Sequence, residues 1–130
     1  MDAIAKDRRF HRHGIEVVEL AIVLPLLLLL VLGVLEYGWL FLNMQRATNA
    51  ARHGARIAAA LSATPADGEA AIDALLGGVP VASRSVVLVE GDIVEATVTL
   101  NTADIDVVKA TFLPVPDTLR AVVRLAKEHT

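Results

Sequence analysis

The stretch Gly14-Ile15-Glu16-Val17-Val18-Glu19, followed by an uncharged apolar run from Leu20 to Leu35, decides the fold of this chain. A helix needs about 20 predominantly apolar residues to cross roughly 30 Å of hydrocarbon, and residues 17–35 supply nearly that length. The run is too long for the apolar core of an ordinary secretory signal, and no small-residue cleavage motif follows it. Trp39 and Phe41 then stand where interfacial aromatic residues are expected. The sequence therefore predicts a membrane anchor.

Charge is distributed unevenly along the chain. The formal net charge is −3, but residues 1–14 contain Lys6, Arg8, Arg9 and Arg12 against two aspartates. Basic residues beside a span remain on the cytoplasmic side of the membrane. We therefore expect residues 1–14 to be a cytoplasmic leader and the acidic remainder to be translocated. The basic residues are too few, and too close to a span, to predict nucleic-acid binding.

The segment from Gly14 to Leu30 resembles the N-terminus of TadE-like proteins, the pseudopilins of tight-adherence (Flp-type IV) pilus systems. Glu36-Tyr37-Gly38 and residues 49–56 are also similar to that family. The resemblance implies that a prepilin peptidase cuts after Gly14, so that Ile15 becomes the mature N-terminus. It also implies that Glu19 of one subunit meets the mature N-terminus of a neighbour.

Two positions depart from the family pattern. Glu16 is acidic at the second mature position, where such proteins usually carry a small, polar or apolar residue. Leu20 follows Glu19 where the major Flp pilins carry tyrosine, which favours the pseudopilin branch over the major filament subunit.

The function that the resemblance implies is that of a minor pilin or pseudopilin, which takes part in assembly of the pilus for adhesion or secretion. The implied partners are the prepilin peptidase, other pilins, pilus assembly platform proteins and membrane lipid. The implied location is the inner (cytoplasmic) membrane, crossed once, with the C-terminal domain in the periplasm or outside the cell and possible incorporation into the pilus. The alternative is a single-span membrane-anchored binding module that is never cut.

The helix is expected to continue beyond the membrane, because residues 43–63 contain no proline and are rich in alanine and arginine. We predict one long helix over residues 15–63. At 100° per residue its small side chains form a stripe opposite the basic side chains, and the stripe consists of Ala47, Ala51, Gly54, Ala55 and Ala58. Such a stripe allows close approach of another element. Its partner is either the C-terminal domain of the same chain or a neighbouring subunit.

Residues 64–130 are predicted to form a small α+β head with a short helix and an antiparallel sheet. Thr64, Pro65 and Asp67 form a helix-start signature, and Gly77-Gly78 marks the stop. The apolar face of this helix is expected to consist of Ala71, Ile72, Leu75 and Leu76.

Three strands are expected in the head. Residues 85–90 and 93–100 form a hairpin through Gly91-Asp92, with Val94, Ala96, Val98 and Leu100 on one face. Residues 119–127 also alternate, and a strand is preferred there over a helix because of the valines. Residues 112–117 are expected to form an irregular loop.

No catalytic constellation is recognisable. The sequence contains no glycine-rich phosphate loop and no nucleophile elbow. There is no cysteine, and the four histidines lack the spacing of metal ligands. We therefore expect a peptidase substrate and not an enzyme, with no cofactor, metal or small-molecule substrate.

Overall fold

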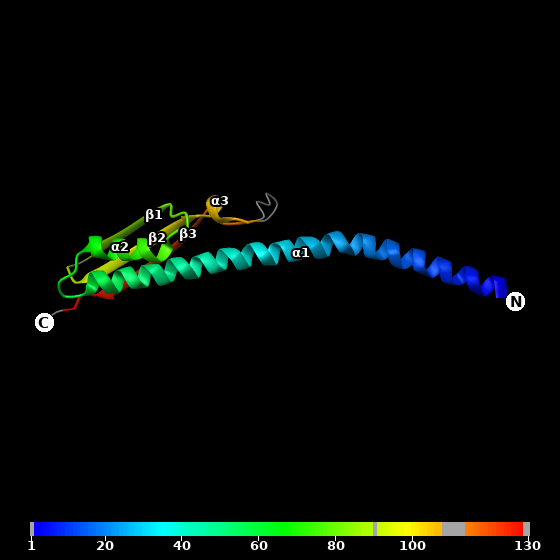
Figure 1. The fold of residues 1–130 in the computed structure, drawn as a ribbon, viewed down its shortest axis with the longest axis horizontal. Helices are drawn as coiled ribbons and strands as arrows, with labels where there is room; N and C mark the ends of the chain where they lie inside the picture. The colour runs from blue at the N-terminus through cyan, green and yellow to red at the C-terminus, as the bar shows by residue number, and fades with distance from the viewer. Residues whose placement is uncertain (1, 90, 108–113, 129–130) are drawn as a thin grey trace. The chain divides into compact units, whose positions relative to one another are not determined.

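The computed structural model describes residues 2–89, 91–107 and 114–128, and its side chains from Gly14 onward. It divides into two compact units, Met1–Leu35 and Glu36–Thr130. The first unit is helical (Figure 1). The second contains the remainder of the same helix together with residues 64–130, and from here on we call this whole second unit the head. The predicted architecture is confirmed: a long apolar N-terminal helix precedes a small domain with a short helix and a three-stranded antiparallel sheet.

Helix α1 (Asp2–Ala59) begins within the predicted leader and ends four residues before the predicted end at Ala63. The early end has a physical cause in the hydrogen bonds of the last turn. The carbonyl of Ala59 accepts the N–H of Glu128 at 3.0 Å, and the Ala60 N–H donates to Ile57 O at 3.2 Å in a tighter turn. The chain therefore leaves the helical path before Ala63.

Helix α2 (Pro65–Leu76) starts at the predicted capping box. The Asp67 carboxylate accepts the backbone N–H and the hydroxyl of Thr64, both at 2.8 Å. These bonds, the backbone bond first, hold the pKa of Asp67 below its ordinary value of 3.8. The helix ends at Leu76, and Gly78 follows with a left-handed φ of 89°, which a glycine adopts without strain.

The sheet has the order β1-β2-β3, with β1 (Ser83–Val89), β2 (Ile93–Asn101) and β3 (Thr118–Ala126) all antiparallel to their neighbours. The hairpin turn lies at Gly91, whose φ is 78°. The predicted strand near the C-terminus is confirmed. The predicted inner face of β2 is buried as well, because its side chains Val94, Ala96, Val98 and Leu100 are all 1% exposed or less.

The core of the head lies between this face of the sheet and the two helices. Figure 1 shows α2 and the strands beside the C-terminal part of α1. Ile72 of α2 is fully buried with the alanines of α1 and the valines of β2. The Glu69 carboxylate of α2 accepts the backbone N–H of Val86 in β1 at 3.2 Å, so that α2 is tied to one edge of the sheet.

Some local expectations differ from the structure. Leu75 was expected on the inner face of α2 but is exposed, because the buried face follows a spacing of four residues through Gly68, Ile72 and Leu76. The one-turn helix α3 (Thr102–Ile105) was not predicted. Glu90 of the expected first strand, and Phe112 and Leu113 of the expected loop, lie outside the described residues.

Candidate functional site

The predicted processing segment lies on the surface of α1. The side chain of Ile15 is 64% exposed, and a Cβ added to Gly14 would meet nothing within 4 Å. Glu19 is exposed and forms no hydrogen bond or ion pair with the part of the chain that the structure describes. Because residues four apart share one face of a helix, Ile15 and Glu19 lie one above the other on α1.

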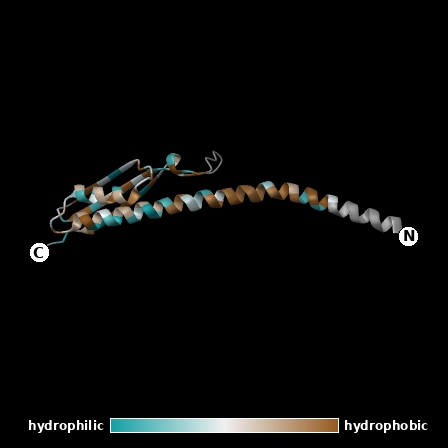
Figure 2. Cartoon of the chain, viewed as in Figure 1, coloured by the Kyte–Doolittle hydropathy of each residue, from teal (hydrophilic) through white to brown (hydrophobic). Residues whose placement is uncertain are grey.

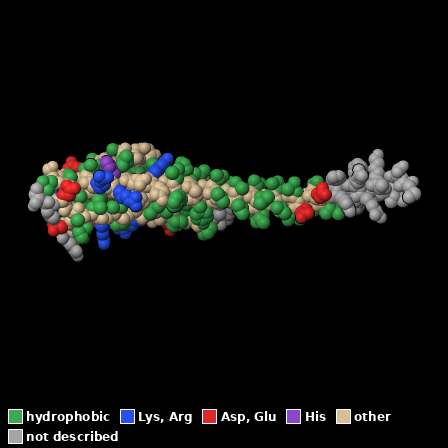
Figure 3. Space-filling model, turned by 90° about the horizontal axis from the view of Figure 1, so that it is seen from below, with side chains coloured by type: hydrophobic (Ala, Val, Ile, Leu, Met, Phe, Trp, Pro, Cys, Tyr) green, Lys and Arg blue, Asp and Glu red, His purple; other side chains and the backbone are tan. Residues whose placement is uncertain are grey.

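The apolar run that follows is uncovered. The side chains from Leu20 to Leu35 are mostly exposed, and Figures 2 and 3 show the hydrophobic residues along this part of the helix. Leaving one such side chain in water instead of burying it costs about 1.5–3 kcal/mol. Within the described residues, α1 is the one helix that is long enough and apolar enough to cross a membrane. It suggests a single-pass membrane protein.

The small-residue stripe of α1 is buried in the head. Ala47, Ala51 and Ala55 are fully buried, Ala58 is 2% exposed, and Gly54 is buried beside them. The partner across Gly54 is α2 of the same chain, because a Cβ at Gly54 would lie 2.7 Å from the carbonyl oxygen of Gly68. In this structure the stripe therefore faces the chain's own C-terminal domain and not a surface left open for a neighbour. The basic residues opposite, Arg46, Arg52, His53 and Arg56, are exposed.

A buried carboxylate begins the head. Glu36 is 1% exposed, and its two carboxylate oxygens lie 3.3 and 3.2 Å from the backbone nitrogen of Val107, which donates to them. A buried charge without partners is strongly unfavourable, so these contacts are essential to its placement. Sequence reasoning missed this role. The signal was available, because the buried stripe of α1 continues backward from Ala47 through Asn43 and Leu40 to Glu36 at helical spacing.

Two aromatic residues of α1 form hydrogen bonds with the segment that runs from the end of α3 towards β3. The Trp39 indole N–H donates to the Ile105 carbonyl at 2.7 Å, and the Tyr37 hydroxyl donates to the Pro114 carbonyl at 2.6 Å. Together with Glu36 they attach the region after β2 to the first turns of α1 in the head. We call Glu36, Tyr37 and Trp39 the clasp.

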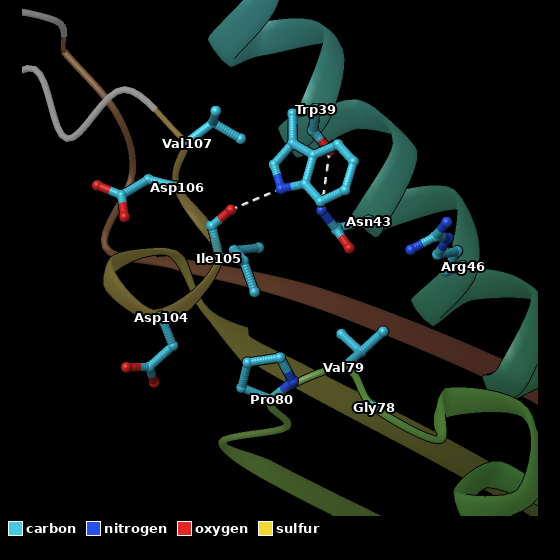
Figure 4. A pocket seen from close by; sticks show the side chains of 10 residues that line it. All are labelled: Trp39, Asn43, Arg46, Gly78, Val79, Pro80, Asp104, Ile105, Asp106 and Val107. Carbon is cyan, nitrogen blue, oxygen red and sulfur yellow. Dashed lines mark hydrogen bonds between the residues drawn. The ribbon is translucent and has the colours of Figure 1, made fainter.

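A hollow of about 350 Å³ lies beside Trp39, between α1, the turn after α2 and the region around α3 (Figure 4). Asn43 is 2% exposed and donates to the Trp39 carbonyl at 3.0 Å. The Arg46 guanidinium lies 5.9 Å from the centre of the indole ring, close enough for a cation–π contact. Figure 4 shows the carboxylates of Asp104 and Asp106 directed away from the indole.

The described residues contain no group of three or more His, Cys, Asp or Glu side chains that could hold a metal ion. Both the stripe and the clasp lie within the head. The structure leaves Gly14, Ile15 and Glu19 as an exposed segment of the first unit.

The family model described as TadE-like protein matches residues 14–56. The resemblance noted from the sequence is therefore confirmed over the predicted cleavage segment, the apolar run and all of the stripe except Ala58. This similarity suggests a protein related to Tad pili. No curated protein and no solved structure matches the chain.

Proposed function

We propose that this chain is a minor pilin or pseudopilin of a Tad (Flp-type IV) pilus system, cut by a prepilin peptidase between Gly14 and Ile15 and used in pilus assembly for adhesion or secretion. One observation carries the proposal: the match to TadE-like protein begins at Gly14 and continues through the apolar run into the stripe. It therefore covers the segments that processing, anchoring and packing would use.

The surroundings of Gly14 support cleavage there. A peptidase needs an extended and accessible backbone, and Gly14 is exposed with open space around it. Glycine destabilises a helix interior by roughly 0.5–1 kcal/mol relative to alanine. Local unwinding at this position is therefore easier than at the leucines that follow.

The charge distribution supports one orientation. The basic residues of the leader favour a cytoplasmic N-terminus. The head then lies on the periplasmic or outer side of the inner membrane, where it can meet other pilins and the assembly platform.

Glu19 gives the anchor a role in assembly. After cleavage, the amino group of Ile15 is positive, and by resemblance to type IV pilins the Glu19 of a neighbouring subunit meets it. Opposite charges 4 Å apart attract by about 4 kcal/mol at an effective dielectric constant of 20, before the cost of desolvation is subtracted. The exposed Glu19 is available for such a partner. In this role the chain is a peptidase substrate and a structural subunit, not an enzyme.

Deletion of the gene in its host tests the proposal, with pili counted by electron microscopy and attachment to a surface measured in parallel. We expect both to fall and to be restored by the wild-type chain. Unchanged pili would contradict the proposal and favour the alternative, an unprocessed membrane-anchored binding module.

A further inference from the structure

The exposed apolar surface of α1 does not end where the first compact unit ends. Between Glu19 and Arg46 the only charged residue is Glu36, and its side chain is buried. In the first turns of the head, Tyr37 is 46% exposed and Phe41 is 65% exposed. The first turns of the head's own helix therefore present an uncharged surface that begins directly after the apolar run along the chain.

The clasp is the reason that this surface lacks a charge. Glu36 would carry a carboxylate next to hydrocarbon if it faced outward, and such placement is costly. Instead, the carboxylate accepts the Val107 N–H. The side chain of Val107, at the other end of this contact, is apolar and 60% exposed.

An apolar groove of about 600 Å³ lies at the same end of the head. Its lining contains no charged side chain and includes Tyr37, Leu40, Phe41 and Met44 of α1 together with Pro116 and Leu119 near the start of β3. Contiguous exposed apolar patches mark an interaction surface more often than single exposed apolar side chains do.

We propose that this end of the head is embedded in the membrane interface and that lipid acyl chains fill the apolar groove. The inference rests on the membrane anchoring of the proposed function. Continuity along the chain supports lipid as the occupant, because the groove residues on α1 start two positions after the apolar run ends. The four residues after Leu35 rise about 6 Å along the helix, which matches the depth of the polar region on each side of a bilayer, roughly 5–8 Å.

The side chains around the groove also match the chemistry of a bilayer interface. Tyrosine and tryptophan concentrate at headgroup level. Tyr37 and Trp39 lie just after the apolar run, and their polar atoms form hydrogen bonds within the head. Arg46 is the first exposed charge beyond the groove, and its guanidinium lies over the Trp39 ring. Long basic side chains commonly place the charge in water in this way while their stems cover apolar surface.

The absence of cysteine from the chain permits a clean test. The full chain is reconstituted in liposomes at low protein density, with a single nitroxide attached to Phe41→Cys or Val107→Cys. Leu88→Cys is the matched control, because Leu88 is an exposed apolar residue on β1, near the hairpin turn. Relaxation of the label is measured with oxygen, which partitions into lipid, and with a nickel chelate, which stays in water.

We expect the oxygen-to-nickel ratio at both labels, Phe41 in the groove and Val107 beside Glu36, to exceed the ratio at Leu88 and to approach that of Leu28→Cys in the apolar run. Ratios equal to that of Leu88 would show a head standing clear of the bilayer and would overturn the inference. Protection from both reagents would also overturn it, since a second copy would then fill the groove. Water accessibility at Leu28 would contradict the anchor itself, so failure of the two proposals can be distinguished.

Discussion

Gly54 and Gly68 face each other where α1 meets α2. A Cβ on Gly54 would come within 2.7 Å of the Gly68 carbonyl oxygen, and a Cβ on Gly68 within 2.8 Å of the Gly54 carbonyl oxygen. Both obstacles are backbone atoms, so neither can move aside as a flexible side chain would. The two helices can pack at this distance only because both positions are glycine.

A larger residue at position 54 should therefore separate the helices. Gly54→Leu is expected to destabilise the head by about 1–3 kcal/mol or more, the usual cost of overpacking a core. Arg52→Ala, on the exposed face, should change stability by less than about 0.5 kcal/mol. Thermal unfolding of the full chain in detergent, followed by circular dichroism, measures both. Equal melting temperatures for Gly54→Leu and wild type would mean that the stripe is no more than a helix-favouring composition.

Removal of the Glu36 carboxylate should loosen the connection before β3. Glu36→Ala removes the acceptor of the Val107 N–H, and a hydrogen bond to a charged group contributes about 1.5–3 kcal/mol. Hydrogen exchange at Val107 should accelerate, while exchange in the middle of β2 should follow only the change in global stability. Glu36→Gln keeps one acceptor oxygen and should restore much of the protection. Equal exchange at Val107 in Glu36→Ala and wild type would show that the Glu36 carboxylate does not hold this connection in place.

The capping box predicts a pH dependence at one end of α2. Hydrogen bonds from Thr64 lower the pKa of Asp67 in the folded protein. A lowered folded pKa means that the carboxylate contributes stability above its unfolded value of about 3.8 and loses it as the pH falls through the folded value. Wild type should therefore be more stable than Asp67→Asn at neutral pH, and the two melting temperatures should converge in acid. A difference that stays constant down to strongly acidic pH would contradict this linkage.

Glu19 should matter for assembly and not for anchoring. Glu19→Ala should still be cut after Gly14 and accumulate in the membrane, because a carboxylate contributes nothing favourable to the anchor itself. It should fail to copurify with the pilus partners, since the amino group of a neighbour loses its counter-charge. Glu16→Ala, in the same exposed segment, is the matched control and should copurify normally. Wild-type recovery of Glu19→Ala would refute the pairing role.

Much of the fold could be predicted because its signals are local. The apolar run, the capping box at Thr64 and the alternation of β2 each lie within a single helix or strand, and all are present in the structure. The stripe was also visible as a helical pattern. The partner of the stripe could not be predicted, because small side chains allow a sheet, a helix or a neighbouring subunit to approach equally closely. Only the contact between Gly54 and Gly68 in the structure identifies α2 as the partner.

The parts that could not be predicted depend on contacts between distant segments. Leu75 has the right spacing for the inner face of α2, yet it is exposed, and Gly68, Ile72 and Leu76 form the buried face that packs in the head. From the sequence, Glu36 was noted only as part of a family resemblance. Its burial depends on a backbone N–H 71 residues away along the chain, and no local period encodes such a partner.

The mass of the protein extracted from membranes tests the central claim most directly. In a host with a working prepilin peptidase, the intact mass should correspond to a chain beginning at Ile15, and Gly14→Val should retain Met1 and the whole leader. Gly38→Val is the matched control, because Gly38 is also an exposed glycine of α1 with nothing within 4 Å of an added Cβ, and this variant should be cut normally. A full-length, uncut wild-type chain under these conditions would contradict the assignment as a pilin and leave a plain membrane anchor.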